Sequence, residues 1–133
     1  MSIVVVGSIA YDTVITPYGR RDHTLGGAAT FFSVAASYFC PVQVVGVVGD
    51  DFSDDDVEVF RARGVDIQGI DRRPGKSFRW GGEYSWNLNE RETLFTDLNV
   101  FEEFDPELPP AYRSAPYVFL ANIAPALQLS VLE

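Results

Sequence analysis

Two short runs of β-branched residues constrain the fold of this chain more than any other feature. Ile3–Val6 and Val42–Val48 are almost continuously apolar, and each is followed at once by a glycine. A strand without polar alternation is typical of a parallel sheet that is covered on both faces. Tyr117–Ala121 has the same character, so we expect three buried core strands of this kind.

Helical segments separate these strands along the chain. Ala28–Cys40 is apolar around most of its circumference and rich in small residues, as in a closely packed interior helix, and Pro41 ends it. A second helix begins with the acidic triplet Asp54–Asp56, which suits the positive end of the helix dipole, and stops at Gly64. The alternation predicts an α/β fold, with a mainly parallel sheet and flanking helices.

The stretch 77–87 has a different period. Aromatic residues take four of its five even positions and polar residues most of its odd ones, which predicts a strand with one apolar face. Thr93–Thr96 can pair back onto this strand. Asp12–Thr16 offers a further short strand, followed by turn residues at Pro17–Asp22. We therefore expect a small antiparallel β flap, and a flap with an apolar face must cover something.

Composition argues against several classes of partner. The 133 residues include 10 Lys and Arg and 19 Asp and Glu, a formal net charge of −9. No basic cluster is present, and affinity for nucleic acid comes largely from cations on phosphates, so we expect no nucleic-acid partner. No apolar run approaches the length of a membrane span, and we expect no membrane contact. A single cysteine, Cys40, makes no internal disulfide, which favours the reducing cytoplasm.

Two common phosphate-binding motifs are absent. Gly7 ends the first strand, but the dinucleotide fingerprint G-x-G-x-x-G must lead into a helix, and Ser8–Asp12 leads into another strand. Gly75-Lys76-Ser77 lacks the upstream glycine of a Walker sequence. Neither motif therefore supplies an ATP site here.

Asp12 and the glycine pair Gly26-Gly27 are the strongest candidates for a binding site. Paired glycines before a helix let a ligand approach free backbone N–H groups, although close packing of helix on sheet is the commoner reason for such a pair. Asp12 follows the first strand, at the carboxyl edge where open α/β sheets bind ligands. Its carboxylate can accept two hydrogen bonds from a polyol, or it can cap a local turn.

Other polar residues are weaker candidates. Arg79, on the polar face of the flap, can reach an anionic or hydroxylated ligand, and Asn122 ends a core strand, but an exposed strand arginine and a loop-capping asparagine are at least as common. His23 is the single histidine and is expected in a surface turn, so we predict no triad and no multi-histidine metal site. A solvated helix start explains the carboxylates of 50–56, and we expect no metal site there.

Four short segments follow one another in a characteristic order: Gly7–Asp12, Gly26–Thr30, Val45–Asp51 and Gly64–Asp66. In this order they resemble the ribokinase-like (PfkB-type) carbohydrate and nucleoside kinases over most of the chain. The resemblance implies a ribokinase-like α/β fold in which Asp12, Gly26 and Gly27 hold substrate hydroxyls. It also implies that the flap, with strands around residues 12–25 and 76–98, is the lid over the substrate.

Two positions depart from the pattern of that family. Its members often carry asparagine where this chain has Phe31, and ribokinase carries asparagine where this chain has Ala10. These departures indicate a substrate that is more apolar than ribose, or differently shaped. Thr30 can restore part of the lost hydrogen bonding, or it can simply face the core. The substrate class stays open between sugar and nucleoside. With Arg79 and Asn122, Phe31 and Thr30 complete the set of candidate substrate-binding residues.

The segments that complete a kinase of this family are not found in these 133 residues. The family's glycine-rich segment, with its anion hole and catalytic base, and most of its ATP site belong to a C-terminal half, and the last helix, from about Pro125, is still apolar where the chain stops at Glu133. We therefore expect residues 1–133 to be the N-terminal, substrate-binding part of a sugar or nucleoside kinase. The whole enzyme would use ATP and Mg²⁺. This part would hold no catalytic residue, bind no cofactor and be inactive alone.

A non-catalytic sugar-binding or dimerisation module is the alternative from a different class. In that interpretation the aromatic residues of the flap form an interface with another chain, because an exposed aromatic sheet face usually marks a partner surface. A homodimer through the β lid is compatible with both interpretations, and we expect one.

Overall fold

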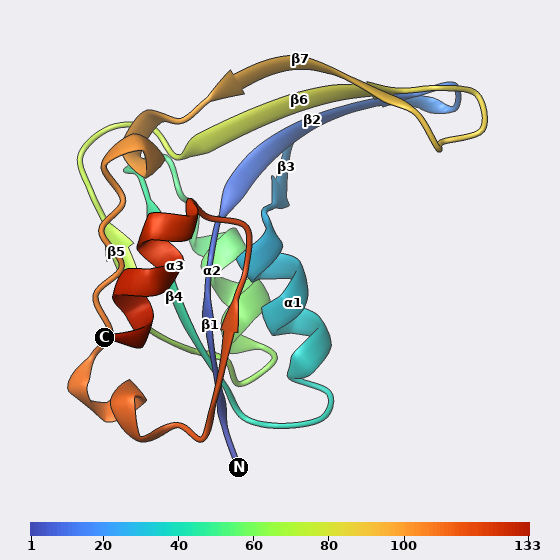
Figure 1. Cartoon of the computed structure of the whole chain (residues 1–133). Helices are drawn as coiled ribbons and strands as arrows, with labels where there is room; N and C mark the ends of the chain where they lie inside the picture. The colour runs from blue at the N-terminus through green and yellow to red at the C-terminus, as the bar shows by residue number, and fades with distance from the viewer.

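The computed structural model describes residues 1–133 and contains two four-stranded sheets (Figure 1). The first is entirely parallel, with the strand order β5-β4-β1-β8. Its strands are β1 (Ile3–Val6), β4 (Val42–Val48), β5 (Asp66–Arg72) and β8 (Tyr117–Leu120). The parallel sheet predicted from the apolar runs is confirmed, and it forms the body of the molecule.

The second sheet, which we call the lid, extends from one end of the body (Figure 1). Its strands, in the order β3-β2-β6-β7, are β2 (Ala10–Thr16), β3 (Gly19–Gly26), β6 (Phe78–Tyr84) and β7 (Arg91–Asp97). The pairs β2–β3 and β6–β7 are antiparallel, whereas β2 and β6 run parallel. The lid is therefore mixed and not wholly antiparallel, because β2 and β6 both leave the carboxyl edge of the body sheet in the same direction.

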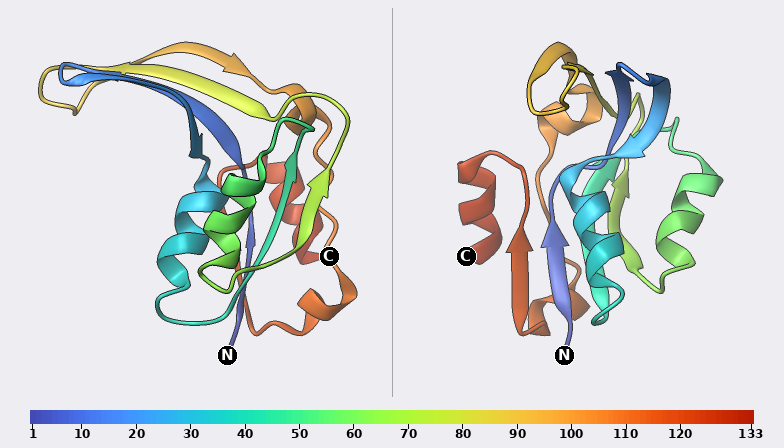
Figure 2. Two further views of the ribbon diagram at one scale, coloured as in Figure 1. Left: turned by 180° about the vertical axis from the view of Figure 1, so that it is seen from behind. Right: turned by 90° about the vertical axis from the view of Figure 1, so that its right-hand side faces the viewer.

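Helices cover both faces of the body sheet (Figure 2). Helices α1 (Ala28–Ala36) and α2 (Asp54–Arg61) pack on one face, and α3 (Pro125–Leu132) packs on the other with the short 3-10 helices η1 (Asn99–Glu103) and η2 (Pro110–Ser114). Side chains of β1 and β4 alternate between the two resulting cores. Because both faces are covered, these strands need no polar alternation.

Two expected boundaries differ from the observed ones. Helix α1 ends at Ala36 and not at Cys40, because the N–H groups that follow Ser37, those of Tyr38 and Phe39, bond three residues back and close the helix with a tight turn. The turn expected at Pro17–Asp22 is limited to its first two residues, since the strand β3 already begins at Gly19.

Strand β8 was expected to be buried, and this prediction is wrong. Its residues Tyr117, Val118 and Phe119 are 55%, 40% and 37% exposed. The strand pairs with β1 on one side and has no neighbour on the other, so it is an edge of the sheet. Phe119 still stacks on Phe32 of α1, with ring centroids 3.6 Å apart. None of the helices is long and apolar enough to cross a membrane.

Candidate functional site

Asp12 lies where the lid leaves the carboxyl edge of the body sheet, in the third position of β2. It is half-buried, and its carboxylate makes no hydrogen bond or ion pair with any protein group. Burial raises the pKa of Asp12 above its usual value. A partly desolvated carboxylate without a partner does not stabilise the fold, and it is free to accept hydrogen bonds from a ligand.

Gly26, the last residue of β3, lies directly against this carboxylate. A Cβ built at Gly26 would collide with Oδ2 of Asp12 and lie 2.8 Å from its Cγ. Gly26 pairs with Ala10 across the β2–β3 ladder, so Asp12 is its diagonal neighbour on the same face. The structure therefore brings two of the predicted site residues into contact, and glycine is required here for space.

Gly27 turns the chain from β3 into α1. Its φ of 96° and the close approach of the Ser8 carbonyl both favour glycine. We expected the glycine pair to leave helix N–H groups free for a ligand, but Ser8 accepts two of them. Its Oγ bonds the N–H of Ala28 at 3.1 Å, and its carbonyl bonds the N–H of Ala29 at 3.0 Å. Close packing of the helix, the alternative reason given for the glycine pair, therefore accounts for Gly27.

Thr30 and Phe31, in the first turn of α1, have opposite surroundings. Thr30 is 4% exposed and its Oγ1 has no hydrogen-bond partner, which fits the alternative of a residue facing the core. Phe31 is 65% exposed, and its N–H bonds the carbonyl of Gly27 at 3.1 Å. Of the two, Phe31 is therefore the one accessible to a ligand.

Asn122 follows β8 at the same carboxyl edge of the body sheet. The preceding N–H, that of Ala121, bonds the carbonyl of Val6 at 2.8 Å, which holds this loop beside the end of β1. The side chain of Asn122 is exposed and bonds no protein group. The structure thus places it at the edge from which Asp12 projects, without a capping role.

Arg79 lies on the opposite face of the lid from Asp12. Asp12 pairs with Trp80 across the parallel β2–β6 ladder, whereas Arg79 pairs with Tyr11. Because neighbouring side chains of a strand point to opposite faces, Arg79 and Asp12 are separated by the sheet. The structure does not bring these two candidates together.

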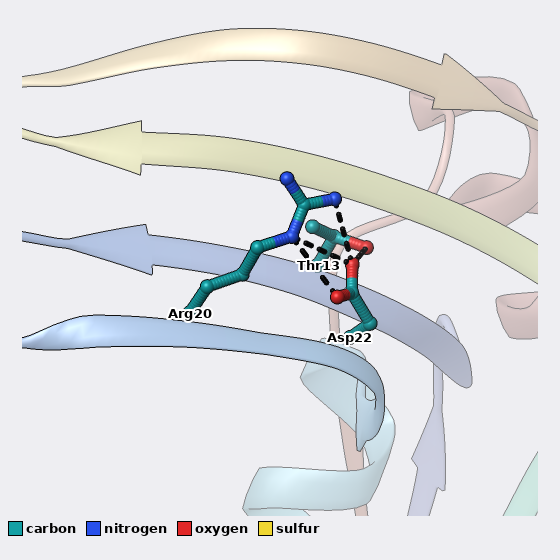
Figure 3. Close-up of polar contacts among 3 residues, drawn as sticks. All are labelled: Thr13, Arg20 and Asp22. Atoms are coloured by element: carbon teal, nitrogen blue, oxygen red, sulfur yellow. Dashed lines mark hydrogen bonds and ion pairs between the residues drawn. The ribbon is translucent and has the colours of Figure 1, made fainter.

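The Arg79 face of the lid carries a polar cluster of its own (Figure 3). Thr13 donates to Oδ1 of Asp22 at 3.1 Å, and Nε of Arg20 donates to Oδ2 of Asp22 at 2.9 Å. The hydrogen bond from Arg20, with smaller contributions that include the charge of Arg79, holds the pKa of Asp22 below its usual value. His23 is exposed, as expected, but it lies in a strand irregularity with φ of 52° and stacks on Tyr11 at 3.8 Å.

The acidic segment 49–56, a loop followed by the first turn of α2, holds both strands that enter the lid, which sequence reasoning missed. At the start of β2, the hydroxyl of Tyr11 donates to the carboxylate of Asp56. At the start of β6, Oγ of Ser77 donates to Asp51 at 2.7 Å and accepts the N–H of Gly49 at 2.9 Å. Asp51 and Asp56 are therefore not merely a solvated helix start. Tyr11 and Ser77 are buried polar residues, and their burial would have indicated that they bond other groups. The sequence alone does not show which residues are buried.

Trp80 is a further residue that the candidate set omitted. It shares the Asp12 face of the lid, and the outer edge of its indole lies over Gly82, where a Cβ would collide with it. The guanidinium of Arg91 lies 5.1 Å from the ring centroid. An aromatic ring and an unpaired carboxylate thus occupy neighbouring strands on one face.

The site contains no group of three or more His, Cys, Asp or Glu side chains that could hold a metal ion. The larger hollows of the chain, of about 340 and 350 Å³, lie beside Lys76 and beside Phe104. Neither is lined by Asp12 or the glycine pair. We identify the site by its chemistry and not by the size of a cavity.

Similarity to known proteins supports the resemblance found in the sequence. No protein-family model matches the chain. A cytidine kinase from Thermococcus kodakarensis is 26% identical over 135 aligned positions, which cover 100% of this chain and 48% of that protein. The nucleoside kinase of Methanocaldococcus jannaschii, an archaeal member of the ribokinase family, superposes with a TM-score of 0.68 at 14% identity, over 98% of this chain and 47% of that one. This chain therefore has the fold of the ribokinase-like kinases.

Two further similar structures carry ligands. A nucleoside kinase from Burkholderia thailandensis, in complex with inosine, has a TM-score of 0.64 at 18% identity, over 73% of this chain and 37% of that one. A fructokinase from Xylella fastidiosa with bound ATP has a TM-score of 0.56 at 25% identity, over 69% of this chain and 31% of that one. The chain spans about half the length of the curated relative that it matches.

Proposed function

We propose that residues 1–133 are the N-terminal, substrate-binding portion of an ATP- and Mg²⁺-dependent nucleoside or sugar kinase. The observation that carries this proposal is the unpaired carboxylate of Asp12, which lies on the backbone of Gly26 at the carboxyl edge of a parallel sheet. Open α/β sheets bind ligands at that edge. The half-length match to ribokinase-like kinases supports the same conclusion.

The chemistry that Asp12 can perform is substrate binding. A carboxylate accepts two hydrogen bonds at once, and the adjacent hydroxyls of a ribose or other sugar present two donors with matching spacing. Phosphoryl transfer also needs a base near the attacking hydroxyl and charge stabilisation around the transferring phosphate. The residues brought together here do not provide these groups, so the proposal leaves both to the rest of a kinase.

A nucleoside is the substrate that we favour over a free sugar. Trp80 offers an aromatic ring on the face that carries Asp12, and nucleobases stack on such rings. The relatives include a cytidine kinase and a nucleoside kinase that binds inosine. A ribose that bonds Asp12 would leave its base near the lid. Cytidine and inosine are therefore the first ligands to test.

Calorimetric titration of this chain with cytidine, inosine, D-ribose and D-fructose tests the proposal. We expect a nucleoside to bind, and Asp12→Asn to weaken its binding at least tenfold, because the amide loses one acceptor and all of the charge. Glu92→Gln, at an exposed position of β7, is the matched control for the lost charge and should bind normally. Equal affinity in the unaltered chain and Asp12→Asn, or no binding of any of the four compounds, would contradict the proposal.

A coupled ATP assay addresses the catalytic part. We expect no nucleoside-dependent ATP consumption by this chain alone. A fusion of this chain to the C-terminal half of the T. kodakarensis cytidine kinase should phosphorylate a nucleoside. Turnover by residues 1–133 alone would show that the catalytic groups are within this chain. The cytoplasmic location stays a prediction.

Dimerisation through the lid is a second candidate role, supported by one observation. Tyr18 and Trp86, at the tips of the two hairpins, are 76% and 75% exposed, and their ring centroids are 5.9 Å apart. Adjacent exposed aromatic rings are typical of a partner surface. This role is compatible with substrate binding, because Asp12 lies at the opposite end of the lid.

A further inference from the structure

The position of Asp12 is set by something other than its own contacts. Its carboxylate lies against Gly26 but has no hydrogen-bond partner, so no polar interaction of the side chain fixes its direction. The backbone of β2 must therefore aim the side chain, and the side chain of the adjacent residue Tyr11 anchors that backbone to the body.

Three kinds of contact fix the side chain of Tyr11, which is 1% exposed. Its hydroxyl donates to the carboxylate of Asp56 and accepts the N–H of Ser53 at 3.2 Å, both at the start of α2. Its ring stacks on His23 of β3 at 3.8 Å, with an angle of 17° between the planes. Phe52 packs against it with ring centroids 5.9 Å apart. Tyr11 thus joins the start of the lid to the body.

Alternation along β2 transfers this constraint to Asp12. With the side chain of Tyr11 held against α2, the next side chain must point to the opposite face, where the backbone of Gly26 lies. We propose that Tyr11, through its bridge to Asp56 and Ser53, is a positioning residue that aims the carboxylate of Asp12 at the substrate. Its effect on ligand affinity rests on the proposed function, whereas its effect on the surroundings of Asp12 does not.

Tyr112 provides a matched control within the same chain. It is also 1% exposed, and its hydroxyl donates to Asp66 at 2.7 Å and accepts the N–H of Gly69 at 3.1 Å. This bridge joins η2 to β5, away from the lid. Tyr11→Phe and Tyr112→Phe therefore remove the same hydroxyl from the same kind of bridge, and only the first is next to Asp12.

Titration of the Asp12 side chain by carbon-13 NMR is the first measurement. Burial is the cause of the raised pKa of Asp12, so a loosened backbone that admits water will lower this pKa toward 3.8. We expect Tyr11→Phe to produce this shift and Tyr112→Phe to leave the titration unchanged. Loss of the Asp12 signal in Asp12→Asn confirms its assignment. An unchanged titration in Tyr11→Phe, or equal shifts in the two variants, overturns the proposal.

Affinity for cytidine and inosine is the second measurement. Tyr11→Phe should weaken binding about tenfold, since small displacements of a binding group have large effects, while Tyr112→Phe should not. If Asp12→Asn leaves affinity intact, the proposed function fails, and the titration still decides the role of Tyr11.

A change at Asp56 tests the same bridge from its other end. Asp56→Ala removes the acceptor for the Tyr11 hydroxyl and should lower the pKa of Asp12. Asp56→Asn keeps an acceptor at that position and should leave the pKa of Asp12 close to its value in the unaltered chain. These variants decide the question if Tyr11→Phe does not fold. A shift of equal size in both, or in neither, contradicts the bridge.

Discussion

At the residue scale, the unpaired carboxylate of Asp12 lowers the stability of the fold and is free to bind a ligand. A half-buried carboxylate loses hydration, and this one gains no hydrogen bond in return. Such a group persists where its chemistry is used, and it leaves a measurable trace in the pH dependence of stability.

Asp12→Asn should stabilise the chain at pH 7 and have little effect below pH 3.8. The raised pKa means that the folded chain holds the Asp12 proton more tightly than the unfolded chain does. Stability is therefore lost as the pH rises from the usual value of 3.8 through the folded value, and the amide removes that loss. We expect a gain on the order of 0.5 kcal/mol after solvent screening, measured by urea unfolding at both pH values. Glu107→Gln, which removes an exposed carboxylate between η1 and η2, controls for overall charge, and an equal gain there would contradict the argument.

Gly26→Ala should destabilise the chain and displace the carboxylate of Asp12. The added methyl collides with Oδ2 of Asp12, and overpacking of this kind costs about 1–3 kcal/mol. In an Asp12→Ala background the clashing atoms are absent, so the same change should cost much less. The free energy of unfolding of the unaltered chain, Gly26→Ala, Asp12→Ala and the double variant tests this. Additive effects would show that the two residues do not interact.

The sequence predicted individual site residues better than their relationships. Asp12 and Gly26 were found because a strand followed by an acid, and a glycine pair before a helix, are local patterns. That Arg79 lies across the sheet from Asp12 depends on the β2–β6 register, which is not local. Tyr11 was missed because, in the sequence, an aromatic residue in a strand looks like any other core residue. Only the structure shows that its hydroxyl bonds Asp56.

At the element scale, the lid is attached to the body through two strands that meet one loop. Ser77 is fully buried and bonds both Asp51 and the N–H of Gly49, as Tyr11 bonds Asp56. The segment 49–56 therefore fixes the spacing of β2 and β6 where they enter the lid. Period-two patterning predicted β6, and a short strand was expected at Asp12–Thr16, but the parallel pairing of β2 with β6 follows from this shared attachment.

Ser77→Ala should loosen the lid at its second attachment. The change leaves the N–H of Gly49 without a partner and removes one donor from Asp51, at a cost of about 1–3 kcal/mol. Hydrogen exchange should become faster in β6 and β7 than in β1 and β4. Ser114→Ala, at an exposed hydroxyl in η2, is the control and should change neither stability nor exchange. Uniformly faster exchange would point to global destabilisation instead.

At the scale of the whole molecule, we compare two of the surfaces that could mediate association. One is the pair of aromatic rings at the lid tip, and the other is the open edge of β8, where an unpaired strand can recruit another. The apolar run Tyr117–Leu120 predicted a strand, but its position at an edge depends on what lies beside it and could not be predicted.

Trp86→Ser should reduce self-association, and Val118→Lys should not. The first change removes a ring that is 75% exposed at the lid tip, and the second places a charge on the β8 edge, where lysine opposes strand pairing. Sedimentation velocity over a range of concentrations measures both. A dimer that survives Trp86→Ser and dissociates with Val118→Lys would place the interface at β8.

The parallel pairing of β2 with β6 also has a consequence for the order of folding. These strands are neighbours in space but are separated in sequence by β3, α1, β4, α2 and β5, so their contact closes a long loop. Each hairpin can form early from local contacts, but the central ladder of the lid must wait until the body has brought β2 and β6 together. The lid should therefore consolidate last, and the site at its base should be complete only in a chain that has finished folding.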